Sequence, residues 1–137
     1  MKNREYKPKK GQVTDKELLQ LAEKHPDFLI FIWSPELPLS LKTLPIVKEL
    51  ANKKKLPLYI YLFMGSSLKV ASAISEIEKY PKEYLVKMNS FELSLRGINR
   101  HRPGLFRYKN GQLLKNGLFG YKSLEEYESI FNDWEKP

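Results

Sequence analysis

The stretch FLIFIWSPELPLSLKTLP, from Phe28 to Pro45, decides the fold of this 137-residue chain. Residues 28–33 are a continuous apolar run of strand length, which is typical of a central strand buried on both faces. A turn with two prolines follows, and the apolar spacing then predicts a helix over residues 40–54. Pro45 lies inside that helix, where its missing backbone N–H is expected to produce a kink. The stretch therefore predicts a buried strand, a turn and a helix in succession.

Two landmarks in this stretch, Trp33 and Pro45, have the spacing of the active-site segment of the thioredoxin superfamily. In that family a strand ends in Trp, a Cys-x-x-Cys turn opens a helix, and a proline lies inside the helix. At the two cysteine positions this chain has Leu37 and Ser40, so that the motif reads LPLS. Nearly all of residues 28–134 resembles this superfamily, and the layout is closest to the TlpA/ResA-type thioredoxin-like proteins.

The chain contains no cysteine, which excludes thiol redox chemistry, thiol nucleophiles, disulfides and thiolate metal sites. Phe31 stands where many thioredoxins carry a buried Asp that serves in proton transfer, and an apolar residue there adds to the core. We interpret Ser40 as a helix cap. Its alternative role as a nucleophile needs a base, for which the chain offers His25 and His101. The resemblance thus implies a redox-inactive thioredoxin-like domain.

The remaining segments alternate between helix and strand signals. Capping boxes begin at Thr14 and Ser123, and Asn110-Gly111 is a hairpin turn signal. The expected helices cover residues 15–24, 68–80 and 90–97 and a last segment from 123, and the expected strands cover 56–63, 84–88, 104–109 and 112–118. In the second of these helices the expected inward-facing residues are Val70, Ala71, Ala73, Ile74 and Ile77.

This order of elements predicts an α/β fold with a mixed central sheet, helices on both faces, and a C-terminal β-hairpin followed by a helix. The resemblance implies the same arrangement as a thioredoxin-like three-layer fold. The length fits a single domain, which we place at residues 13–137. Residues 1–12 are predicted to be a basic, disordered arm.

A second family landmark is a loop that ends in a cis-proline facing the Cys-x-x-Cys turn. Residues 97–103 resemble this loop, with one extra residue, and Pro103 takes the position of the cis-proline. Basic residues gather around it, interleaved with Phe106 and Tyr108: Arg96, Arg100, His101, Arg102, Arg107 and Lys109. One interpretation is a solvated surface; the other is a groove that binds an acidic or phosphate-bearing partner.

The net charge of +8 is concentrated partly in the first ten residues, where five Lys and Arg against one Glu give 5 − 1 = +4. Such an arm is either solvated or in contact with nucleic acid, anionic lipid or an acidic partner. No apolar run is long enough for a membrane span, and no apolar segment follows the basic start as in a secretory signal. We expect a cytoplasmic protein; the alternative is an extracytoplasmic domain whose signal or anchor was trimmed.

The function expected from these features is a protein- or peptide-binding accessory or assembly module without redox activity. One alternative is a non-redox enzyme using Ser40 or a polar group near the basic loop, and another is a basic nucleic-acid or membrane-surface binder. No catalytic, cofactor or metal residue is assigned, because the chain has no GxGxxG, GxxxxGK[ST] or HExxH motif. The candidate partner-binding residues are Trp33, Leu37, Pro38, Leu39, Arg100, His101, Arg102 and Pro103.

Overall fold

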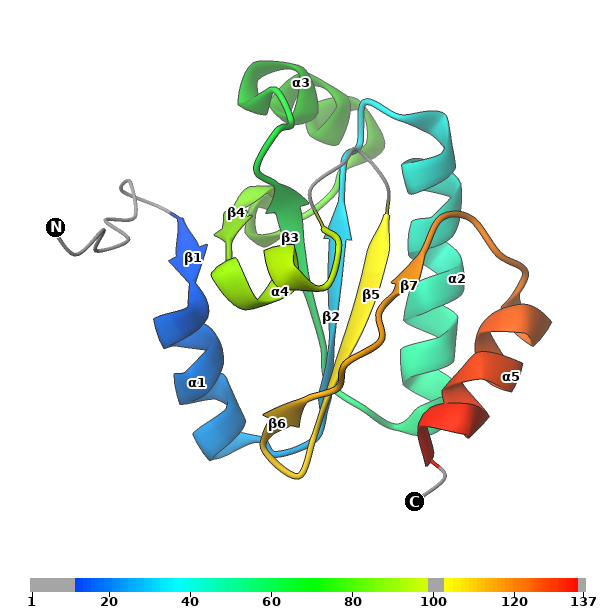
Figure 1. Cartoon of the computed structure of the whole chain (residues 1–137). Coiled ribbons are helices and arrows are strands. Elements are labelled where there is room, and N and C mark those ends of the chain that lie inside the picture. The colour runs from blue at the N-terminus through cyan, green and yellow to red at the C-terminus, as the bar shows by residue number, and fades with distance from the viewer. Residues whose placement is uncertain (1–11, 99–102, 136–137) are drawn as a thin grey trace, which may run out of the picture.

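The computed structural model describes residues 12–98 and 103–135, which form a mixed α/β fold around one seven-stranded sheet (Figure 1). The strand order is β1-β4-β3-β2-β5-β6, and β7 pairs with β5. The strands are β1 (Val13–Thr14), β2 (Phe28–Trp33), β3 (Leu58–Phe63), β4 (Lys87–Asn89), β5 (Gly104–Lys109), β6 (Gln112–Leu113) and β7 (Leu118–Phe119). The helices are α1 (Asp15–Lys24), α2 (Pro38–Lys54), α3 (Leu68–Glu78), the 3-10 turn η1 (Lys82–Leu85), α4 (Phe91–Leu95) and α5 (Leu124–Glu135).

Strand β2 is the centre of the sheet, as its apolar run predicts. It pairs in parallel with β3 and antiparallel with β5, and all six of its side chains are buried. Because successive side chains of a strand point to opposite faces, the strand contributes to two cores. Leu29, Phe31 and Trp33 pack towards α2 and α5. The alternate residues of β2 pack towards α1 and α4, so helices cover both faces of the sheet.

Several predicted elements have the expected bounds. Helix α1 matches its prediction at both ends, and the backbone N–H of Thr14 donates to Glu17 at 2.8 Å in the predicted capping box. The capping box of α5 is also confirmed, since the N–H groups of Ser123 and Glu126 each donate to the other side chain. Asn110 and Gly111 both have positive φ angles, 54° and 78°, as the predicted hairpin turn requires.

Other bounds differ from prediction. Helix α2 begins at Pro38 rather than at residue 40, because proline fits the first helical position, where no backbone N–H is needed. Residues 84–85 belong to η1 rather than to a strand. The predicted strand over 112–118 is two short strands, β6 and β7, which pair with β5 separately. Between them lies Gly117, where a Cβ atom would come within 2.6 Å of the Phe106 ring.

The orientation predicted for α3 is wrong for Val70, Ala73 and Ile77, whereas Ala71 is buried as predicted and Ile74 is half-buried. Val70 and Ile77 are 44% and 78% exposed, and Ala73 is exposed as well. Only Ala71 and Ser75 of this helix are buried. The spacing of apolar residues shows which of them share a helix face, but what covers that face depends on the rest of the chain. Among the described residues, no helix is long and apolar enough to cross a membrane.

Candidate functional site

The turn between β2 and α2 presents apolar side chains at the carboxyl end of the central strand. The backbone N–H of Leu37 donates to the carbonyl oxygen of Ser34 at 2.9 Å, which closes the turn. Leu37 then caps α2 without a side-chain hydrogen bond, and Pro38 is the first helical residue. Leu37 is half-buried, Pro38 is exposed and Leu39 is 55% exposed. We call residues 37–39 the apolar turn.

A buried serine network, formed by Ser34, Ser40 and Ser66, holds the apolar turn in place. The backbone N–H of Ser34 donates to the Oγ of Ser40 at 2.8 Å, and the Ser66 hydroxyl donates to the Oγ of Ser34 at 2.7 Å. All three side chains are at most 3% exposed. The network therefore ties together the end of β2, the first turn of α2 and the segment that follows β3.

The interpretation of Ser40 as a helix cap is wrong. Because α2 begins at Pro38, Ser40 lies inside the first helical turn, and Leu37 takes the cap position. The Ser40 side chain is fully buried, and its hydroxyl oxygen accepts from a backbone N–H. Among the described residues, no acid or base hydrogen-bonds to it. The described part of the chain therefore lacks the adjacent base that a serine nucleophile needs, and the candidate base His101 lies outside it.

Trp33 is a core residue rather than a surface residue, which corrects its place among the partner-binding candidates. Its ring is fully buried, and its indole N–H donates to the carbonyl oxygen of Tyr84 at 2.9 Å. The Tyr80 ring packs edge-on against it, with 5.1 Å between ring centroids. Phe31 is also fully buried and adds to the same core, as expected. The burial of these two side chains follows from the burial of β2 on both faces.

Three candidates of the basic loop, Arg100, His101 and Arg102, lie outside the described residues. The predicted cis peptide bond joins Arg102 to Pro103, so this prediction also falls outside them. Pro103 itself is buried, and its carbonyl oxygen accepts from the N–H of Gly120 at 2.9 Å.

The described basic residues near this loop do not form one surface. The Arg107 side chain is only 5% exposed, pairs with Glu135, and lies 4.6 Å from the centre of the Phe131 ring. The guanidinium hydrogen bond lowers the pKa of Glu135. Arg96 lies over the other face of the sheet, where it donates to the carbonyl oxygen of Leu114 at 3.0 Å and pairs with Glu92. Lys109, two residues along β5 from Arg107, lies on the same face and also pairs with Glu135. Because Arg96 follows α4 on the opposite face, the predicted basic cluster is divided between two faces.

The interleaved aromatic residues are not available as a binding surface either. Phe106 and Tyr108 are both buried, on the face that α1 and α4 cover. Tyr108 stacks on Phe28, with 4.6 Å between ring centroids. Burial raises the pKa of Tyr108 to about 12. These rings contribute to the fold rather than to an exposed aromatic patch.

A cavity of about 250 Å³ opens at the same edge of the sheet, near the carboxyl ends of three parallel strands. This edge is where open α/β sheets commonly bind ligands. Apolar side chains and a few polar ones line the cavity: Ile32, Phe63, Met64, Met88, Asn89, Ser90, Ser94 and Ile98. No local sequence signal indicates this cavity, because its walls come from segments far apart in the chain.

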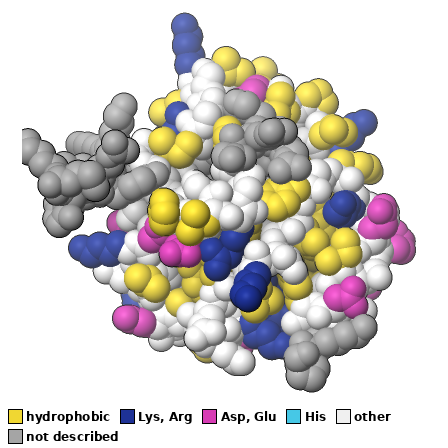
Figure 2. All heavy atoms as spheres, viewed as in Figure 1, with side chains coloured by type: hydrophobic (Ala, Val, Ile, Leu, Met, Phe, Trp, Pro, Cys, Tyr) yellow, Lys and Arg dark blue, Asp and Glu magenta, His cyan; other side chains and the backbone are white. Residues whose placement is uncertain are grey.

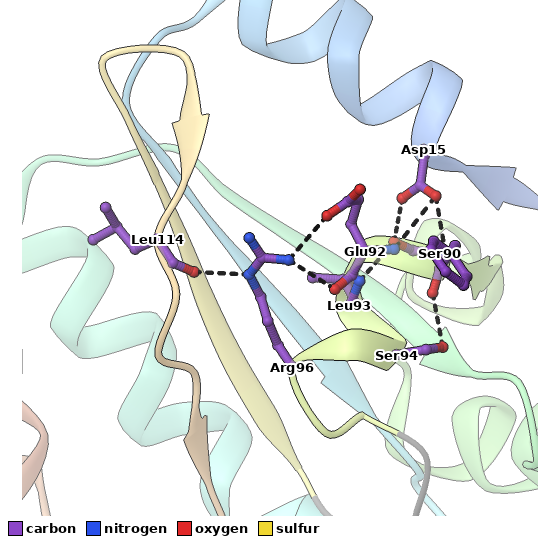
Figure 3. Close-up of polar contacts among 8 residues, drawn as sticks. Asp15, Ser90, Glu92, Leu93, Ser94, Arg96 and Leu114 are labelled. Carbon is purple, nitrogen blue, oxygen red and sulfur yellow. Dashed lines mark hydrogen bonds and ion pairs between the residues drawn. The ribbon is translucent and has the colours of Figure 1, made fainter.

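One wall of this cavity is held by a carboxylate from α1 (Figure 3). Asp15 accepts from the hydroxyl of Ser90 and, at 2.9 Å, from the backbone N–H of Phe91. The Ser90 hydroxyl oxygen in turn accepts from the N–H of Leu93 at 3.0 Å and so caps α4, as predicted. Asp15 thus fixes α4, and with it Ser90 and Ser94, against the first helix.

Glu36 is a polar residue of the turn whose two carboxylate oxygens are shielded from solvent. Among the described residues, neither oxygen has a hydrogen-bond partner. Within residues 12–98 and 103–135, no group of three or more His, Asp or Glu side chains could hold a metal ion.

The chain matches no protein-family model and no curated protein.

Proposed function

We propose that this chain is a redox-inactive thioredoxin-like domain that binds a protein or peptide partner through the apolar turn. Support for the scaffold comes from the order β2-α2-β3 with β5 antiparallel beside β2. Further support comes from Trp33 at the end of β2 and Pro45 inside α2. The absence of cysteine removes thiol chemistry from this scaffold.

The observation that carries the proposal is an exposed apolar side chain on a rigid base. Leu39 is 55% exposed at the edge of the sheet, while the serine network below it is buried and hydrogen-bonded. Pro38 restricts the backbone beside it. A preorganised apolar contact loses little conformational freedom when a partner binds, which favours affinity.

The two alternatives have less support among the described residues. An enzyme based on Ser40 needs access to its hydroxyl, which is buried. A nucleic-acid surface around the basic loop needs free cations there, whereas the described residues Arg96 and Arg107 are paired. On the face shown in Figure 2, Lys and Arg side chains are interspersed with apolar and acidic ones. An acidic partner remains part of the proposal through Arg100 and Arg102 of the basic loop.

The test is site-specific photo-crosslinking in cells that express the protein. A photoreactive amino acid replaces Leu39 in one variant and Leu19 in the control, which is 60% exposed on α1. We expect one protein or peptide to be cross-linked from position 39 and not from position 19. Leu39→Asp should abolish capture of that partner, whereas Leu19→Asp should not. The proposal is wrong if position 39 captures nothing, or the same products as position 19.

A further inference from the structure

Helix α3 lies at one end of the molecule (Figure 1), and it presents an apolar stripe to solvent. The stripe consists of Val70, Ala73 and Ile77, which are all exposed. Their spacing of three and four residues places them on one face of the helix. At 78% exposure, Ile77 has less contact with the rest of the chain than any other large apolar residue described as exposed. Contiguous apolar side chains that are exposed to water commonly mark an interaction site.

Two opposite charges flank this stripe. Lys69 lies in the first turn of α3 and Glu76 near its end. They are seven residues apart, so they share one flank of the helix but are about 10 Å apart along its axis, too far for an ion pair with each other. Both are exposed, and neither belongs to the ion pairs of the described residues.

These charges oppose the dipole of their own helix. A helix is stabilised by anions at its N-terminus and cations at its C-terminus, and α3 has Lys69 and Glu76 in the reverse order. The first turn of α3 contains no acidic residue and the last turn no basic one. Within one molecule this order costs stability. A neighbouring helix of opposite direction, with its acidic end beside Lys69, would reverse that effect.

We propose that α3 pairs with α3 of a second copy of this chain, antiparallel and about a two-fold axis near Ala73. Val70 of each copy then lies against Ile77 of the other, and the small side chain of Ala73 allows close approach at the centre. Lys69 of each copy lies on the same flank as Glu76 of the other, which forms two equivalent ion pairs. A two-fold interface requires such a self-complementary surface.

The charge pattern selects this arrangement over the alternative direction. In a parallel two-fold pair, the flank that carries Lys69 and Glu76 lies on opposite sides of the interface in the two copies, so neither ion pair forms. In the antiparallel pair the carboxylate of Glu76 also lies near the N-terminal turn of the neighbouring α3, where the helix dipole favours it. The interface is one three-turn helix per copy, smaller than a standard stable interface. We therefore expect a weak dimer, with a Kd on the order of 100 μM.

Sedimentation equilibrium across a wide range of protein concentration tests the proposal. The full chain is compared with Ile77→Lys, Lys69→Glu, Glu76→Lys and the double variant Lys69→Glu/Glu76→Lys. All changed side chains are exposed, and circular dichroism checks that each variant folds. We expect Ile77→Lys to be monomeric throughout. Each single charge variant should raise Kd about tenfold, because two attractive pairs become repulsive.

The double variant and a mixture distinguish this interface from general surface effects. Exchanging both charges restores the two ion pairs, so the double variant should dimerise about as well as the unmodified chain. An equimolar mixture of Lys69→Glu and Glu76→Lys should form a heterodimer for the same reason. At concentrations where all are monomers, both single variants should melt at higher temperature than the unmodified chain, because each improves the match to the helix dipole.

Three outcomes would overturn the proposal. The first is a monomer at concentrations of about 1 mM, ten times the expected Kd. The second is a dimer that Ile77→Lys leaves unchanged. The third is a double variant that dimerises no better than the single variants. If α3 binds a different protein rather than a second copy, the purified chain will remain a monomer, which is the first outcome.

Discussion

The Oγ of Ser40 accepts a hydrogen bond of 2.8 Å from the backbone N–H of Ser34, the residue that directly follows the central strand. In a thioredoxin-like motif, the position of Ser40 would hold the second cysteine of a reactive pair. In this chain the side chain of Ser40 has a structural role. It fixes the end of β2 to the first turn of α2 and so determines where the apolar turn lies.

Replacing Ser40 with alanine should destabilise the fold. The substitution leaves the N–H of Ser34 buried without its acceptor, which costs about 1 to 3 kcal/mol. The free energy of unfolding from urea titration measures the loss. Ser129→Ala on the exposed side of α5 is the matched control and should change stability by less than about 0.5 kcal/mol. Equal effects of the two substitutions would contradict the role assigned to the serine network.

Asp15→Ala should loosen α4. The substitution removes the acceptor for the Ser90 hydroxyl and for the N–H of Phe91, and loss of such hydrogen bonds costs about 1 to 2 kcal/mol. Hydrogen exchange should accelerate at Phe91 more than at residues of β2. Asp15→Asn keeps one acceptor oxygen, so its exchange rate at Phe91 should lie between the rates of Asp15→Ala and the unmodified chain. Uniform acceleration over the chain would mean that Asp15 does not act on α4 in particular.

The ion pair between Glu135 and Arg107 should stabilise the fold at neutral pH and not in acid. The Arg107 hydrogen bond lowers the pKa of Glu135 in the folded state, so its contribution is complete above the unfolded-state pKa and is lost as pH falls through the folded-state pKa. Because Glu135 is 46% exposed, solvent screening limits the contribution to about 1 kcal/mol.

Unfolding of Glu135→Gln at about pH 7 and about pH 3 measures this effect. The variant should be less stable than the unmodified chain at the higher pH, and the difference should become small at the lower pH. Glu23→Gln, at an exposed position of α1, is the control and should show little difference at either pH. A Glu135→Gln deficit that grows towards acid would contradict the sign of the pKa shift.

Much of the architecture could be predicted because its signals are local. The apolar run of β2, the capping boxes and the Asn110-Gly111 turn each involve residues close in sequence. Trp33 could also have been placed correctly from its own strand, since a strand buried on both faces buries its last residue too. The resemblance to an active-site segment suggested a surface role that the burial of Trp33 contradicts.

The parts of the candidate site that were not predicted depend on contacts between distant residues. Asp15 and Ser90 are 75 residues apart in the chain, and nothing in either segment indicates the other. Arg107 was assigned to a basic surface from its neighbours in sequence, although alternation along β5 directs it to the face that carries Glu135. Helix α3 is a further example. Its apolar spacing places Val70 and Ile77 on one face but does not indicate whether the rest of the chain packs against that face.

We propose that the turn after β2 has the geometry of a thioredoxin-type thiol active site, with Leu37 and Ser40 at the two cysteine positions. The double variant Leu37→Cys/Ser40→Cys tests it directly, by thiolate titration and by mass measurement after mild oxidation. Position 37 caps the 17-residue helix α2, whose N-terminus stabilises a thiolate. The account predicts a pKa below about 8.5 for the thiol introduced at position 37 and an intramolecular disulfide on oxidation. Two thiols that titrate at or above that value and do not form this disulfide would contradict it.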